Sequence, residues 1–299
     1  MKAIFKIVFA LAMTLVGGPT MSATFTVLCD DLEHEIAIKA CTVKLTGRIE
    51  PGDAQKLRRA LRQPIPQGWS FGRLLLDSPG GNVAAAIEIA NVVRQALLYT
   101  SMGRVVSAQP PAPSRIDAYS CVSACFLVWV AGAQRISTSF LSPRSPDGTS
   151  EIGLHRPVFD RDTYQRPPSQ IAAMQQEAMQ LTANYLKREQ VPQELIEKML
   201  SRASTQIYWV GPEDANISGM SPWFEEMMIA RCGFNPDRSI AAATYSVDQM
   251  IKRFKESGSF AINDPTREDA REKYDRDRAR QYFACQQATQ LAAQAALRR

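Results

Sequence analysis

The sequence predicts an α/β fold, because short apolar segments typical of buried strands alternate with segments of helical periodicity. Residues 72–81, "GRLLLDSPGG", indicate a buried strand that ends at a Pro-Gly-Gly turn. In the helix predicted over 83–98, apolar side chains recur every three or four residues, as they do on one face of a helix. Strands and a helix alternate again through residues 104–157, and such alternation is typical of an α/β core.

Further elements are expected on both sides of these segments. They are short strands near 24–31 and from residue 40, a helix from Asp53, a buried strand at 104–108, a buried helix at 126–131, strands at 133–137 and 152–157, two helices within 168–203, and a strand that feeds a short helix within 208–220. Asp53 is the expected N-cap of its helix. Beyond about residue 225 the pattern is helical and charged, so we expect one domain over 24–224 and a C-terminal helical extension over 225–299.

Residues 1–23 have the pattern of a signal peptide. Lys2 and Lys6 precede an apolar run at 7–17, and the small pair Ser22-Ala23 suits a signal peptidase. The run is short for a helix that spans a bilayer, although an uncleaved membrane anchor is the alternative. We therefore expect an exported protein, periplasmic or secreted, with no membrane span after removal of the signal.

All six cysteines follow this leader, an even number in an oxidising compartment. They are Cys29, Cys41, Cys121, Cys125, Cys232 and Cys285. Local bridges between the first two and between the last two are expected. The middle pair suits a bridge only if Cys121 lies before the helix begins; two buried thiols are the alternative. Zinc is the weaker hypothesis, because neither histidine has ligand spacing from a cysteine pair, and we expect no metal and no cofactor.

Charge patterning argues against a nucleic-acid partner. The formal net charge is +5, and removal of Lys2 and Lys6 with the leader leaves +3. Basic residues alternate with acids in "TREDAREKYDRDRAR" (266–280), a pattern typical of a solvated helix with ion pairs between successive turns. No basic stripe interleaved with aromatic residues is present in the sequence.

The residue types that acyl transfer needs each occur once in a suitable position. A serine nucleophile needs a base within hydrogen-bond reach, and the oxyanion of the intermediate needs fixed N–H donors. Ser123 lies at the start of the predicted buried helix, where a helix cap is the alternative role. Gly80 and Gly81 end a buried strand, and His155 follows another. His34 lies in a charged stretch, so His155 is the candidate base.

Several segments resemble the proteolytic subunit of the Clp protease and its ClpP/crotonase-fold relatives, and their order matches. They are "LTGRIEPGDAQKL", "LLLDSPGGNVAAAIEIANVVR", "CVSACFLVWVAGAQRIS", "IGLHRP" and "YWVGPEDANISGM". The resemblance covers about residues 43–224, and in detail the sequence is most similar to exported ClpP-like proteins. It implies a repeated β-β-α core, a peptide or protein substrate, and a homo-oligomer, since family members often form rings or trimers.

Carried over by position, the resemblance implies Ser123 as nucleophile and His155 as general base. It implies an oxyanion hole formed by backbone N–H groups of Gly81 or Gly80 and of Ala124. The third member of the triad does not carry over, because the chain reads "STQIY" at 204–208, where the family has an aspartate. A displaced acid, a backbone carbonyl or Gln206 are the alternatives; the acids are Asp160, Asp162, Glu213 and Asp214.

Two functions of different classes follow. The first is an exported ClpP-like serine peptidase that hydrolyses peptide bonds through a Ser-His site. The second is a catalytically inactive scaffold that acts as a binding or assembly protein, which the missing acid favours because triad acids contribute orders of magnitude to the rate. Acyl-CoA chemistry on a crotonase-like site is a third, less suited to an exported protein.

Overall fold

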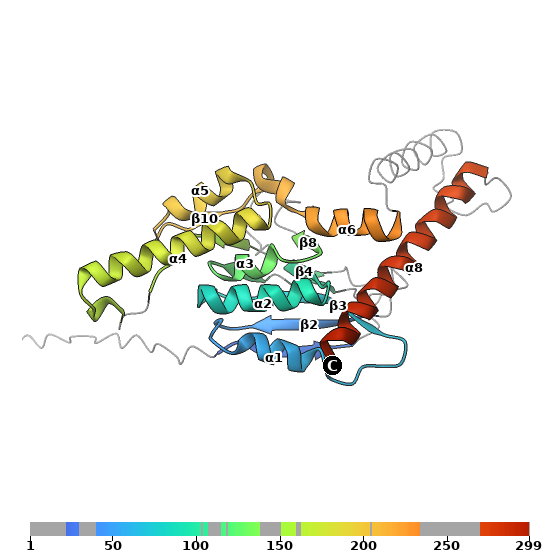
Figure 1. The fold of residues 1–299 in the computed structure, drawn as a ribbon, viewed down its shortest axis with the longest axis horizontal. Helices are drawn as coiled ribbons and strands as arrows, with labels where there is room; N and C mark the ends of the chain where they lie inside the picture. Colours follow the sequence, from blue (N-terminus) through green and yellow to red (C-terminus); the bar gives the residue numbers. More distant parts are fainter. Residues whose placement is uncertain are drawn as a thin grey trace, which may run out of the picture.

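The computed structural model describes residues 22–29, 40–102, 104–106, 115–117, 119–137, 151–159, 163–203, 205–233 and 270–298. Its main sheet has six strands, which lie in the order β1 (Thr24–Leu28), β2 (Ala40–Thr46), β3 (Ser70–Asp77), β4 (Tyr99–Met102), β8 (Gln134–Ser137) and β11 (Gly219–Met220). The four inner strands are parallel, and each outer strand is antiparallel to its neighbour (Figure 1). This arrangement confirms the predicted α/β class.

Helices connect the parallel strands. Helix α1 (Asp53–Ala60) follows β2, α2 (Val83–Gln95) follows β3, and α2 packs between α1 and the short helix α3 (Cys125–Trp129). The side chain of Asn82 caps α2 by accepting a hydrogen bond from the N–H of Ala85 at 2.9 Å. The predicted apolar face of α2 is buried, and every residue of α3 is inaccessible to solvent, as the all-apolar sequence indicated.

A second sheet begins where β3 ends. It has the order β10 (Tyr208–Trp209), β9 (Glu151–Leu154) and β7 (Ser120–Val122), with β7 and β9 parallel. The N–H of Ser78 donates to the carbonyl of Ser120 at 2.7 Å, and the carbonyl of Ser78 accepts from Val122 at 3.0 Å. These two bonds bring β7, and β9 beside it, to the carboxyl end of β3.

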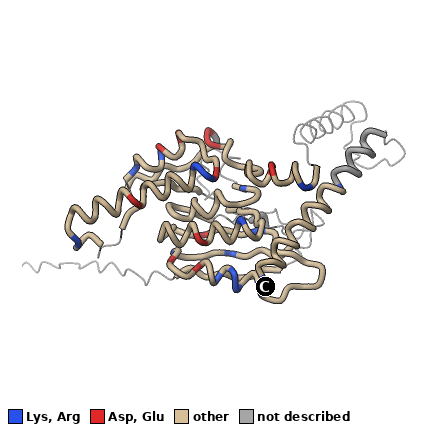
Figure 2. The backbone as a smooth tube through the Cα atoms, in the orientation of Figure 1, with Lys and Arg blue, Asp and Glu red and all other residues tan. Residues whose placement is uncertain are grey.

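The remaining elements belong to neither of these two sheets. They are the pair β5 (Arg104–Val106) and β6 (Arg115–Asp117), the 3₁₀ turns η3 (Thr163–Gln165) and η4 (Pro212–Ile217), and the helices α4 (Pro168–Arg188), α5 (Gln193–Ser201), α6 (Pro222–Cys232) and α8 (Ala270–Arg298). Two helices within 168–203 and a strand feeding a short helix near 208–217 were predicted and are confirmed. Basic and acidic residues are interspersed over the described elements (Figure 2).

The structure corrects one local prediction and adds detail to two others. Gly52, with φ of 90°, is the N-cap of α1 in place of Asp53, whose carboxylate turns back to accept from the N–H of Glu50 at 2.7 Å. Of the strand expected at 104–108, residues 104–106 form β5, which pairs with β6 outside the main sheet, while β4, which was not expected, follows α2 in the main sheet. At the amino end, Ala23 is 1% exposed and donates to the carbonyl of Arg48 at 2.7 Å, so the fold includes residues at the end of the expected leader. The apolar run at 7–17 lies outside the described residues.

All three cysteine pairs are joined: Cys29–Cys41, Cys121–Cys125 and Cys232–Cys285. The first and last bridges confirm the expected local pairing. Cys121 lies in β7 and Cys125 is the first residue of α3, so the middle pair meets the condition that its first cysteine precede the helix. In the ranges that the structure describes, no helix is long and apolar enough to cross a membrane.

The last helix packs against the end of the core where β3 begins. Its Gln294 is buried, and the amide group of Gln294 bonds to the N–H and carbonyl of Phe71 at 3.1 and 2.6 Å. The disulfide Cys232–Cys285 ties α6 to α8. Since Ser78 to Gly81 follow the other end of β3, these α8 contacts lie at the opposite end of that strand from the glycine turn.

Candidate active site

Ser123 occupies a strained turn between β7 and α3. Its φ is 58°, in the left-handed region that costs an ordinary residue about 1–2 kcal/mol. The N–H of Ser123 donates to the carbonyl of Gly153 at 2.7 Å, and the carbonyl of Ser123 accepts from Phe126 at 3.0 Å. The N-cap of α3 is Ala124, and no side chain caps the helix, so Ser123 does not have the capping role that was its alternative. A partly exposed serine in a tight strand-to-helix turn is suited to presenting its hydroxyl.

Gly80 lies in direct contact with this turn. A Cβ at Gly80 would lie 2.5 Å from the carbonyl oxygen of Val122, 2.8 Å from Cβ of Ser123 and 2.9 Å from the amide nitrogen of Ala124. Its φ of 92° is also one that glycine adopts most easily. The Pro-Gly-Gly turn therefore lies so close to the serine turn that there is no room for a side chain at Gly80.

The two glycines differ in what their N–H groups do. Gly80 donates its N–H to Oγ of Ser78 at 3.1 Å, whereas Ile49 bonds to the carbonyl of Gly80 and to the N–H of Asn82, on either side of Gly81. Within the described residues the N–H of Gly81 has no acceptor, and neither has that of Ala124. These two N–H groups are thus available to an oxyanion, while Gly80 contributes the close approach.

His155 directly follows β9 and is 7% exposed. Its Nδ1 lies 2.8 Å from the carbonyl oxygen of Arg156. Because a carbonyl only accepts, Nδ1 carries the proton and Nε2 has a free lone pair that can accept one. The N–H of Arg156 in turn donates to the carbonyl of Arg202 at 3.0 Å, which fixes the chain beside the ring.

The backbones of the serine and histidine segments are adjacent, but the Ser123 and His155 side chains are not hydrogen-bonded to each other. Strand pairing sets Val122 opposite Gly153, and the N–H of Ser123 bonds to Gly153, two residues before His155. Both residues are described by the structure, and the Ser123 hydroxyl makes no hydrogen bond to the His155 ring. Catalytic hydrogen bonds are often long in unliganded enzymes and tighten when substrate binds.

The candidate acids have other partners or lie outside the described residues. Asp214 accepts from the hydroxyl of Tyr208 at 2.7 Å and from Nζ of Lys198 at 3.2 Å, and Glu213 accepts from the same hydroxyl at 3.3 Å. The bond with Tyr208 raises the pKa of Lys198, and burial raises the pKa of Tyr208 to about 12. The N–H of Gln206 donates to the carbonyl of Ala203 at 2.9 Å. Asp160 and Asp162 are not described, so the Arg156 carbonyl is the partner that the described residues provide for His155.

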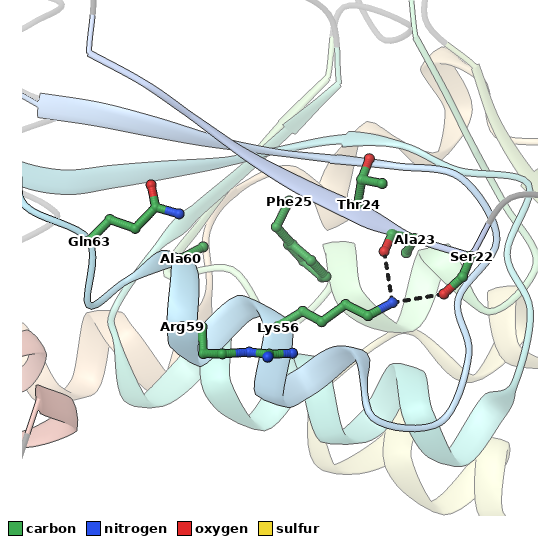
Figure 3. A pocket seen from close by; sticks show the side chains of 8 residues that line it. All are labelled: Ser22, Ala23, Thr24, Phe25, Lys56, Arg59, Ala60 and Gln63. Carbon is green, nitrogen blue, oxygen red and sulfur yellow. Dashed lines mark hydrogen bonds between the residues drawn. The ribbon is translucent and has the colours of Figure 1, made fainter.

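A groove of about 540 Å³ lies elsewhere, between β1 and α1 (Figure 3). Phe25, Lys56 and Arg59 are among its lining residues, and none of the candidate site residues is. Nζ of Lys56 already bonds to Oγ of Ser22 at 2.8 Å and to Asp53 at 2.7 Å. Over the described ranges, no group of three or more His, Cys, Asp or Glu side chains could hold a metal ion.

Comparisons with known proteins give little. No family model matches the chain, and no curated protein matches it. Among solved structures, the chain is similar to a serine-to-alanine mutant of the membrane-bound stomatin-specific protease 1510-N, at 14% sequence identity and a TM-score of 0.37. The match covers 64% of this chain and 83% of the other. Values this low carry no argument about family or activity.

Proposed function

We propose that this protein is an exported serine peptidase of the ClpP/crotonase fold, with Ser123 as nucleophile and His155 as general base. The contact between the Gly80 turn and the Ser123 turn is the observation that carries the proposal. It sets a strained, partly exposed serine beside a backbone with N–H groups free to bind an oxyanion. The signal-like sequence pattern of residues 1–23 and the three disulfides support a periplasmic or secreted location.

The reaction divides into acylation and deacylation. Oγ of Ser123 attacks the carbonyl carbon of a peptide bond while Nε2 of His155 takes the hydroxyl proton. The carbonyl oxygen becomes an oxyanion that the N–H groups of Gly81 and Ala124 bind. His155 then gives the proton to the leaving amine, and water, activated by the same nitrogen, releases the acyl group and restores Ser123.

The carbonyl of Arg156 takes the orienting role of the missing acid in this scheme. It accepts a hydrogen bond from Nδ1–H and so keeps Nε2 free to act as a base. A neutral carbonyl stabilises the imidazolium less than a carboxylate does, so the proposed peptidase is slower than an enzyme with a full triad.

A binding or assembly scaffold is the second candidate, and one observation favours it. No carboxylate among the described residues bonds to His155, and its ring is not bonded to the Ser123 hydroxyl. A chain that kept the fold after losing the acid would have this geometry.

A fluorophosphonate probe on the purified chain without its leader separates the two candidates. For the peptidase we expect labelling of the unmodified protein, none in Ser123→Ala, and a rate lower by at least about 100-fold in His155→Gln. Ser218→Ala, whose hydroxyl donates to the carbonyl of Ala215 at 2.7 Å, is the control and keeps the full rate. An unlabelled wild-type protein would favour the scaffold.

A further inference from the structure

We propose that the disulfide Cys121–Cys125 positions the nucleophile by closing the turn that holds Ser123 in its left-handed conformation. The inference rests on the proposed function, since a positioning role requires a residue whose position matters. Cys121 and Cys125 are positioning residues here, because neither touches the reacting atoms.

The bridge spans the serine turn symmetrically. Cys121 is the middle residue of β7 and Cys125 the first residue of α3, with their Cα atoms 5.2 Å apart. Ser123 is the central residue of the five that the bridge encloses. The disulfide therefore fixes the distance between the strand that enters the turn and the helix that leaves it.

A bridge over so few residues is poorly suited to stabilising the whole fold. In the chain-entropy description, a disulfide restricts the unfolded chain more when it closes a longer loop. The sequence separation is 4 for Cys121–Cys125 and 53 for Cys232–Cys285, so the short bridge is expected to contribute roughly half as much to global stability as the long one. Its main effect is local, on the turn itself.

Burial makes the bridge a permanent part of the site. Both cysteines are fully buried. Cys121 lies opposite Ile152 in β9 and opposite Ser78 at the end of β3. The backbone pairing of Cys121 thus places the bridge beside the strand that precedes His155 and beside Ser78, which precedes the Pro-Gly-Gly turn. A dithiol reductant reaches it only after local opening, which favours a fixed positioning role over a switch.

The test compares two double variants by the rate of fluorophosphonate labelling at Ser123 and by hydrogen exchange of the Ser123 amide. In Cys121→Ala/Cys125→Ala we expect labelling at least about 10-fold slower, because small displacements of a nucleophile have large effects on rate. The Ser123 amide, which donates to Gly153, exchanges at least about 10-fold faster as the turn loosens.

Cys232→Ala/Cys285→Ala is the matched control. Its melting temperature falls further than that of the first variant, yet its labelling rate and the hydrogen-exchange rate of its Ser123 amide match those of the wild type. Equal labelling and equal exchange in the two variants would overturn the proposal. If the first variant does not fold, Cys121→Val/Cys125→Ala keeps the buried volume and takes its place, and failure of both to fold would also overturn it. If the wild type itself is not labelled, the proposed function fails and the positioning of a nucleophile fails with it. Faster exchange of the Ser123 amide in the first variant would then show only that the bridge holds the turn.

Discussion

Replacing Gly80 by alanine tests the contact on which the candidate site depends. The new Cβ would lie less than 3.0 Å from atoms of Val122, Ser123 and Ala124. Two of these three atoms belong to the backbone, so either the glycine turn or the serine turn must move. The substitution therefore changes stability and nucleophile position together.

Gly219→Ala is the matched control. Gly219 has a φ of 91°, against 92° for Gly80, and a Cβ there would meet nothing within 4 Å. Alanine at position 219 therefore lowers the free energy of unfolding only through backbone strain, by about 1–2 kcal/mol. At Gly80 overpacking adds about 1–3 kcal/mol, for a total of about 2–5 kcal/mol.

Urea unfolding measures the change in stability, and fluorophosphonate labelling measures the effect of a displaced nucleophile. We expect Gly80→Ala to lose more free energy of unfolding than Gly219→Ala and to be labelled at least about 10-fold more slowly, since a displacement of the reacting groups by a fraction of an ångström is costly. Equal stability losses together with wild-type labelling in both variants would refute the contact and the site built on it.

Three other substitutions test separate parts of the structure. Gln294→Leu leaves the N–H of Phe71 without its side-chain acceptor, whereas the Phe71 carbonyl keeps Nε2 of Gln290 as a donor at 3.1 Å. The substitution should lower the free energy of unfolding, measured in urea, by about 1–3 kcal/mol; no loss would mean that α8 does not pack as described. Burial raises the pKa of Tyr99 to about 12 from an unfolded value of 10.0. Between these two pH values the native state keeps a proton that the unfolded state releases, so the free energy of unfolding falls as the pH rises. Tyr99→Phe should flatten that fall by up to about 1.4 kcal/mol per pH unit, and an unchanged slope in urea titrations between these pH values would contradict the assignment. Asp214→Asn should leave the labelling rate within about twofold of wild type, because the carboxylate bonds to Tyr208; a large drop would instead assign the missing acid to Asp214.

Much of the fold could be predicted from local patterns, but not β4. The segment Tyr99–Met102 contains Thr100 and Ser101, whose hydroxyls make it look unlike a core strand. Both are buried, and Oγ1 of Thr100 donates to the carbonyl of Trp129 at 2.6 Å. A hydroxyl satisfied by a distant backbone group is acceptable in a core, and sequence alone does not reveal that partner.

The site divides in the same way. The glycine pair and Ser123 could be singled out, because the glycines end a predicted buried strand and Ser123 begins a predicted buried helix. The left-handed φ of Ser123 could not be predicted, since serine seldom adopts it and the bond to Gly153 beside it joins segments far apart in the sequence. The orientation of His155 was equally hidden, because a bond to the next residue's carbonyl leaves no trace in the sequence.

The most direct test of the central claim is the covalent intermediate itself. The purified chain is mixed with a short peptide p-nitrophenyl ester, and the released phenol and the mass of the protein are measured together. A Ser123 nucleophile predicts a burst of one equivalent of phenol per chain, with the acyl group on the tryptic peptide 116–135 and at Ser123 within it. Steady release without a burst and without an acylated chain, or an acyl group mapped to another residue, would contradict the account.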